Sequence, residues 1–133
     1  MLVIFDLNRT LYDPERRALY ADWTILKSLK QKSELWLWSV GDRNWDAVLG
    51  EFGTDGLFSK KIFPKKKSTA DFIGVADQDS VYLVSDYFED IEIGNEMKFQ
   101  TVWIRRGKFR NMQPRTKPKY VITRLIQLRN IIK

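Results

Sequence analysis

The chain has 133 residues, of which 44% are hydrophobic and 30% charged, a balance typical of a globular protein. It contains no cysteine and no histidine, which excludes disulfides, thiolate or imidazole metal ligands, cysteine nucleophiles and histidine bases. Any catalysis must therefore use carboxylates, lysine, hydroxyls and a metal bound through oxygen. At this length we expect one domain, residues 1–133.

The net charge of +6 is concentrated in two segments, residues 60–67 and 105–119. Such segments can attract nucleic acid, but they are more often solvated surface, and we favour surface over a nucleic-acid partner. No apolar stretch resembles a secretory signal or is long enough to cross a bilayer. We therefore expect a cytoplasmic protein with no membrane partner.

Short apolar runs alternate with amphipathic stretches along the chain. The expected strands are residues 2–5, 35–38, 61–63, 81–84, 101–104 and 120–122. Helical spacing of large apolar residues predicts helices within 15–32, 45–52, 89–98 and 125–132. Ser68 and Asp71 resemble a capping box that opens a further short helix, and 107–118 reads as a surface loop. This alternation predicts an α/β three-layer sandwich with a mostly parallel, Rossmann-like sheet.

Polar side chains follow the apolar runs where strands are expected to end. In chain order these are Asp6, Asn8, Thr10, Ser39, Lys65, Lys66, Lys67, Asp86 and Asp90. Ligands bind beyond the carboxyl ends of parallel strands, so we expect these side chains to converge at one edge of the sheet. A carboxylate nucleophile, a hydroxyl, a lysine and a pair of aspartates suit phosphoryl transfer through an aspartyl-phosphate, with Mg²⁺ screening the charge.

These motifs resemble those of the haloacid dehalogenase (HAD) superfamily of aspartate-nucleophile phosphatases. "DLNRT" (6–10) is similar to the first motif, Asp-x-Asp-x-Thr, with Asn8 in place of the second Asp. Ser39 matches the second motif, a lysine of 65–67 the third, and 83–107 the fourth with its following region. Residues 117–132 resemble the last strand and helix of many members, so the likeness spans nearly the whole chain.

The resemblance implies a role for each residue. Asp6 would be the nucleophile and a magnesium ligand, with the backbone carbonyl of Asn8 and the carboxylate of Asp86 as further ligands. Asp90 would support the metal or orient the lysine. The groups that hold the phosphate would be Thr10, Ser39 and Lys67. We favour Lys67 over Lys66 and then Lys65, because it directly precedes the helix that Ser68 opens.

Each of these residues also has a purely structural interpretation. Asp6 and Thr10 could shape a turn, Ser39 could cap a helix, and three consecutive lysines are usually a solvated charge run. Asp86 and Asp90 could be acids favoured near a helix N-terminus. Because the residues recur in order, each after a strand, we favour the site over coincidence.

The spacing of the motifs leaves no room for a cap domain between Asp6 and Ser39 or between Ser39 and Lys67. The resemblance therefore implies a capless enzyme, whose open site suits macromolecular or bulky phosphorylated substrates. We expect Arg9, where the family often has glycine, to point to solvent, with a cation near the phosphate as the alternative.

The asparagine at position 8 affects the expected rate. In the family the second Asp of the motif is the general acid and base, and an amide cannot transfer that proton at neutral pH. We therefore expect a magnesium-dependent phosphatase of low turnover. The alternatives are a phosphate-binding pseudoenzyme and a basic protein associated with nucleic acid.

Overall fold

The computed structural model describes residues 1–41, 45–54, 56–75 and 80–133. These residues form a six-stranded sheet in the order β5-β4-β1-β6-β7-β8, in which every neighbouring pair is parallel. The strands are β1 (Leu2–Phe5), β4 (Glu34–Trp38), β5 (Lys60–Ile62), β6 (Val81–Ser85), β7 (Gln100–Ile104) and β8 (Tyr120–Ile122). The parallel sheet predicted from the sequence is confirmed, and each strand boundary lies within one residue of its expected place.

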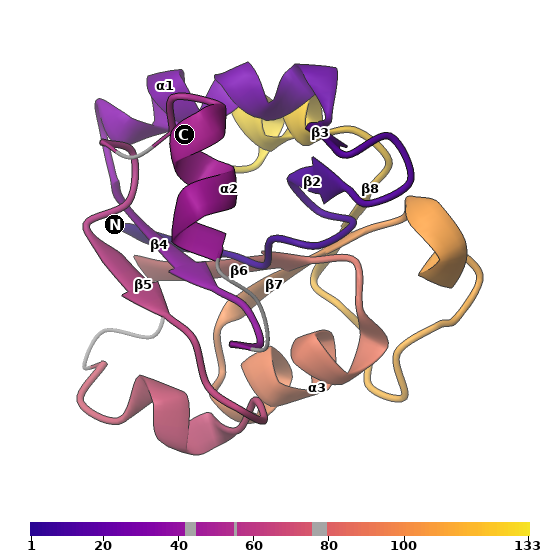
Figure 1. Ribbon diagram of the computed structural model, residues 1–133. Helices are drawn as coiled ribbons and strands as arrows, with labels where there is room; N and C mark the ends of the chain where they lie inside the picture. The colour runs from indigo at the N-terminus through magenta and orange to yellow at the C-terminus, as the bar shows by residue number, and fades with distance from the viewer. Residues whose placement is uncertain (42–44, 55, 76–79) are drawn as a thin grey trace.

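Helices cover both faces of this sheet, as the three-layer prediction requires (Figure 1). The α-helices are α1 (Ile25–Lys30), α2 (Trp45–Glu51) and α3 (Phe88–Glu96). The 3₁₀ turns are η1 (Ala21–Thr24), η2 (Thr69–Phe72), η4 (Gly107–Phe109) and η5 (Leu125–Asn130). In Figure 1, α1, α2 and the yellow C-terminal turn lie above the sheet, and α3 lies below it.

Two apolar cores form because successive strand residues point to opposite faces. Val3 and Phe5 of β1 pack with the residues of α1, α2 and η5 on one face. Ile4, between them, packs on the other face with Phe72 of η2 and Leu83 of β6. No helix in the described part of the chain is both long enough and apolar enough to span a membrane.

The predicted helix 15–32 is wrong in its first part. The short strands β2 (Tyr12–Asp13) and β3 (Ala18–Leu19) form an antiparallel hairpin there, and helical structure begins only at Ala21. Asp13 explains the difference, because its carboxylate accepts hydrogen bonds from the backbone N–H of Glu15 and from Nε of Arg16. Such local bonds favour a turn over a helix.

The remaining predicted helices are present with small changes. The carboxylate of Asp71 accepts the backbone N–H of Ser68 at 3.0 Å, as the capping box requires, and the turn that follows is 3₁₀. The C-terminal segment is likewise a 3₁₀ turn that ends at Asn130. The expected surface loop 107–118 contains only the short turn η4.

Candidate active site

The carboxyl ends of β1 and β6 lie side by side at the centre of the sheet. The chain leaves β1 towards β4 and leaves β6 towards β7, so the two connections diverge and leave a crevice between them. Asp6 follows β1, and its backbone N–H still bonds the carbonyl of Val84 at 3.0 Å. Asp86 follows β6 directly. The topology therefore brings together two carboxylates that are 80 residues apart.

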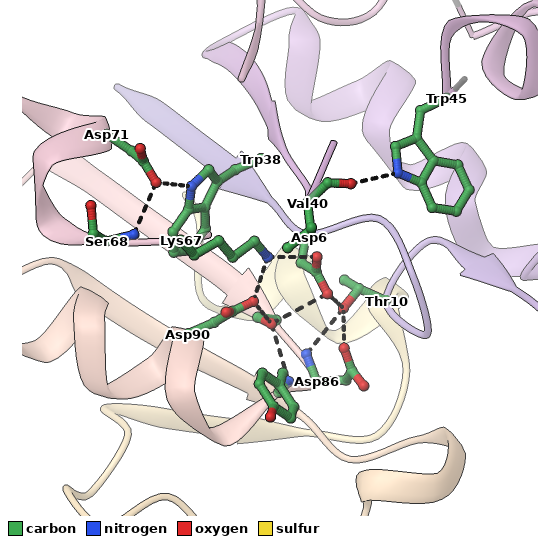
Figure 2. Close-up of polar contacts among 12 residues, drawn as sticks. Asp6, Thr10, Trp38, Val40, Trp45, Lys67, Ser68, Asp71, Asp86 and Asp90 are labelled. Atoms are coloured by element: carbon green, nitrogen blue, oxygen red, sulfur yellow. Dashed lines mark hydrogen bonds and ion pairs between the residues drawn. The ribbon is translucent and has the colours of Figure 1, made fainter. Parts of the chain in front are cut away.

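Thr10 connects these two aspartates (Figure 2). Its hydroxyl oxygen lies 3.2 Å from Oδ1 of Asp86 and 3.4 Å from Oδ2 of Asp6, and it accepts the backbone N–H of Asp86 at 3.0 Å. All three side chains are buried. Thr10 is fully buried and does not line the cavity described below. Its position therefore supports a role in orienting the carboxylates rather than the expected contact with phosphate.

The lysine of the site is Lys67. Its ammonium lies 2.8 Å from Oδ1 of Asp6 and 2.7 Å from Oδ2 of Asp90, and 4.3 Å from the centre of the Trp38 ring (Figure 2). Lys65 and Lys66 are exposed. Of the three lysines left open by the sequence, the favoured one is thus the one that reaches the carboxylates.

Asp90 is held in place from two sides. Besides the Lys67 ammonium, its Oδ2 accepts the hydroxyl of Ser85 at 2.8 Å, and the Ser85 oxygen in turn accepts the backbone N–H of Tyr87 at 3.1 Å. These contacts favour the second of the two expected roles of Asp90, orienting the lysine, over a place in the metal shell. Sequence reasoning missed Ser85, although it stands directly before Asp86.

We refer to six residues as the carboxylate cluster: Asp6, Thr10, Lys67, Ser85, Asp86 and Asp90. Burial, followed by the charge of Asp6, raises the pKa of Asp86 to about 9. Burial also raises the pKa of Asp90, to about 6, although the Lys67 ammonium opposes the shift. Burial acts to lower the pKa of Lys67, but Asp6 and Asp90 outweigh it and raise that pKa above its ordinary value. Three carboxyl groups around one ammonium make a site that favours a further cation.

The donor set fits Mg²⁺. Oδ2 of Asp86 and Oδ1 of Asn8 are buried and find no hydrogen-bond donor among the described residues. Buried polar atoms are nearly always paired, so an unpaired carboxylate oxygen beside a second carboxylate indicates a cation ligand. No group of three or more acidic side chains suited to a metal occurs in the described residues. The carboxylates of Asp6 and Asp86 and the backbone carbonyl of Asn8 would leave coordination positions for water, which Mg²⁺ usually retains.

Four residues of the carboxylate cluster line a cavity of about 370 Å³, namely Asp6, Lys67, Asp86 and Asp90. Ser39, which follows β4 and is buried, lines the cavity as expected for the second motif. Asn8 lines it as well. Residues nearer the surface complete the wall, and we call five of them the rim: Arg9, Lys65, Lys66, Tyr87 and Phe109. The cavity thus joins buried carboxylates to a wall of basic and aromatic residues that also contains the exposed carboxylate of Glu89.

A family model matches part of the chain. The family described as HAD-hydrolase-like matches residues 64–128, a segment that holds Lys67, Asp86 and Asp90. No curated protein sequence matches the chain.

Solved structures extend the likeness to the whole chain. The HAD-hydrolase YfnB from Bacillus subtilis, bound to magnesium, is 19% identical with a TM-score of 0.73 over 88% of this chain. The L-2-haloacid dehalogenase from Xanthobacter autotrophicus is 13% identical (TM-score 0.79), over 98% of this chain and 97% of that one. The D,D-heptose 1,7-bisphosphate phosphatase from B. bronchiseptica, complexed with magnesium and phosphate, is 9% identical (TM-score 0.77), over 98% and 97%.

The chain spans only 57% of the length of YfnB, and nearly all of the other two chains. At these identities the likeness establishes the fold, which is that of HAD-like hydrolases. Together, the fold and the family model support the HAD-like hydrolase superfamily, with phosphatases among the structural neighbours.

Proposed function

We propose that this chain is a magnesium-dependent phosphatase that forms an aspartyl-phosphate on Asp6 and turns over slowly. The observation that carries the proposal is the buried contact of Asp6 with Lys67 and Thr10, beside the unpaired Oδ2 of Asp86. Mg²⁺ bound at Asp6 and Asp86 would screen the repulsion between the carboxylate and the phosphate. The magnesium and phosphate bound by the heptose bisphosphate phosphatase support the same chemistry here.

In the first step a carboxylate oxygen of Asp6 attacks the phosphorus of a phosphomonoester, and the bond from phosphorus to the leaving oxygen breaks. Lys67 holds Asp6 in position and offsets the charge on the phosphoryl oxygens. Ser39, at the cavity wall, would bind one of those oxygens. The leaving oxygen takes its proton from water, because the amide of Asn8 has none to give.

In the second step water attacks the phosphorus of the aspartyl-phosphate. The bond to Asp6 breaks, inorganic phosphate leaves and the carboxylate is restored. No carboxylate stands at position 8 to accept the proton of the attacking water, so this step is also slow. General acid–base catalysis is worth ~10²–10⁴-fold, which is the loss that we assign to Asn8.

The open cavity supports bulky or macromolecular phosphorylated substrates. Between Asp6 and Ser39 the described residues form only the β2–β3 hairpin, η1, α1 and β4, and between Ser39 and Lys67 only α2 and β5. Those elements leave the rim at the surface, because Lys65 and Lys66 are exposed. We therefore propose that the site works without a cap.

The test is a magnesium titration with a panel of phosphorylated compounds, comparing the wild type with Asp6→Asn. We expect release of inorganic phosphate that saturates with Mg²⁺ and disappears in the variant. Asn8 favours one other function, a phosphate-binding pseudoenzyme. Magnesium-dependent binding of phosphate without turnover of any compound would establish that alternative.

A further inference from the structure

Arg9 occupies an unusual backbone conformation at the cavity entrance. Its φ is +61°, in the left-handed region, and its backbone N–H bonds the carbonyl of Tyr12 at 2.7 Å. A residue with a side chain costs ~1–2 kcal/mol there, so glycine or asparagine would be the easier choice. The expectation that Arg9 points to solvent is wrong, because the residue is half-buried and lines the cavity.

The side chain of Arg9 is held by a turn that lies about 100 residues further along the chain. A Cβ atom added to Gly107 would lie 3.2 Å from Cδ of Arg9, so the arginine packs directly on that glycine. The guanidinium carbon lies 5.3 Å from the centre of the Phe109 ring. The Phe109 ring in turn packs against the Tyr87 ring, with 4.9 Å between the two ring centres. Stacking on a ring leaves the N–H edge of a guanidinium available for a ligand.

Within the described part of the chain, this ordered cation has no partner of opposite charge. Among the described residues, no carboxylate forms an ion pair or hydrogen bond with the Arg9 side chain. The other arginine that is half-buried near the site, Arg106, pairs with Asp22 at 2.9 Å. A guanidinium that is packed in place in the same cavity as the proposed nucleophile, with no ion partner among the described residues, is suited to an anion that arrives with the substrate.

We propose that Arg9 binds a second anionic group of the substrate, so that the preferred substrates are phosphomonoesters carrying a further phosphate or carboxylate. The inference rests on the proposed phosphatase function, since Asp6 defines the place of the reacting phosphate and Arg9 that of the second anion. Arg9 is in this account a specificity-determining residue, because it touches the part of the substrate that does not react.

The test uses alkylphosphonates of two to four carbons, whose carbon–phosphorus bond the proposed reaction does not break. At each length the far end is a methyl, a carboxylate or a second phosphonate, and binding is measured by calorimetry in excess Mg²⁺. We expect one length at which an anionic end improves affinity about 10-fold to 100-fold over methyl. Whichever end group improves the affinity more, carboxylate or phosphonate, identifies the kind of second anionic group that the substrate carries.

Variants test whether the gain in affinity depends on Arg9. Arg9→Gln should abolish it, Arg9→Lys should keep part of it, and the matched control Arg129→Gln, at an exposed position on η5, should keep all of it. No gain at any length, or a gain that survives in Arg9→Gln and is lost in Lys66→Gln, would contradict the proposal. If methyl-ended phosphonates also fail to bind, the proposed function itself is contradicted, and this inference with it.

Discussion

The carboxylate cluster and the rim are neighbours in one cavity but are built in opposite ways. In the cluster the three aspartates are buried and the Lys67 side chain is only 11% exposed. Each of these charged side chains is bonded to another member, and Lys67 forms ion pairs with both Asp6 and Asp90. In the rim, Lys65 and Lys66 are exposed and Arg9 is ordered without an ion partner among the described residues. Apart from Oδ2 of Asp86, which we assign to Mg²⁺, the charged groups of the cluster are therefore bonded to one another before a phosphate arrives, whereas Arg9 in the rim has no ion partner among the described residues. In the function that we propose, the cluster carries out the chemistry and the rim selects the substrate.

The largest expected effect comes from removing the cation of the cluster. Lys67→Met leaves the buried carboxylates without their partner, and breaking a buried ion pair from one side costs ~3–5 kcal/mol of unfolding free energy. Denaturant unfolding measures this cost. The matched control is Lys66→Met in the rim, which is exposed and should change stability by less than ~0.5 kcal/mol. Equal losses in the two variants would remove the distinction between cluster and rim.

The next effect tests the absence of a general acid–base at position 8. Asn8→Asp restores a carboxylate at nearly constant shape, so kcat should rise, up to ~10²-fold at the low end of general acid–base catalysis. The gain is limited by the added negative charge beside Asp6. Steady-state kinetics with nitrophenyl phosphate measure it, and magnesium dependence should persist. An unchanged kcat, with activity still lost in Asp6→Asn, would mean that another group transfers the proton.

A smaller effect follows from the second carboxylate of the cluster. Asp86→Asn removes a proposed ligand, so the affinity for Mg²⁺ should fall by at least ~10-fold in calorimetry. Metal-free protein should respond in the other direction, because the variant no longer holds a buried acid beside Asp6. We expect its unfolding temperature at neutral pH to rise by ~4 °C or more. Unchanged magnesium affinity would exclude Asp86 as a ligand.

The stability that the metal-free protein gains from Asp86→Asn should depend on pH. The pKa of Asp86 is raised from 3.8 to about 9 on folding, so the carboxyl contributes no penalty below 3.8, where it is protonated in both states. As pH rises towards 9, the unfolded chain ionises first, and the metal-free wild type loses stability relative to Asp86→Asn. The difference in unfolding temperature should therefore widen from pH 4 to 9 and then level off. A difference in unfolding temperature that stays constant with pH would show that the pKa of Asp86 is not raised in the folded protein.

The smallest effect is expected outside both regions. Charge reversal at Arg110 and Arg115, both exposed, should leave phosphatase activity and stability nearly unchanged. Binding of the wild type to RNA or DNA that is tight and falls steeply with added salt would contradict this and favour the nucleic-acid-associated alternative.

The strands and the carboxylate cluster could both be predicted from the sequence, for the same physical reason. A strand buried on both faces is a short continuous apolar run, and polar residues directly after it must lie at one edge of a parallel sheet. Asp6 and Asp86 could be placed in this way although they are far apart in the chain. The choice among the lysines followed from a local signal too, because Lys67 directly precedes the turn that Ser68 opens, and it is Lys67 that contacts Asp6.

What the sequence did not show depends on contacts between distant segments. The spacing of Leu19 fitted a helix, but its pairing with Tyr12 in the hairpin satisfies the same burial. The position of Arg9 depends on Gly107 and Phe109, whose approach no local pattern reveals. Ser85 was overlooked because a strand-terminal serine is common, and only its bond to Asp90 marks it.

The most direct test of the account is rapid-quench kinetics with nitrophenyl phosphate in the presence of Mg²⁺. Because Asn8 should slow hydrolysis of the covalent intermediate more than its formation with so good a leaving group, nitrophenolate should appear in a burst of about one equivalent per site, followed by slow turnover. Acid-quenched protein should then carry the phosphoryl group on Asp6, as peptide mass spectrometry would show. Turnover without a burst and without phosphorylated Asp6, under conditions where Asn8→Asp also gives no gain, would contradict the account.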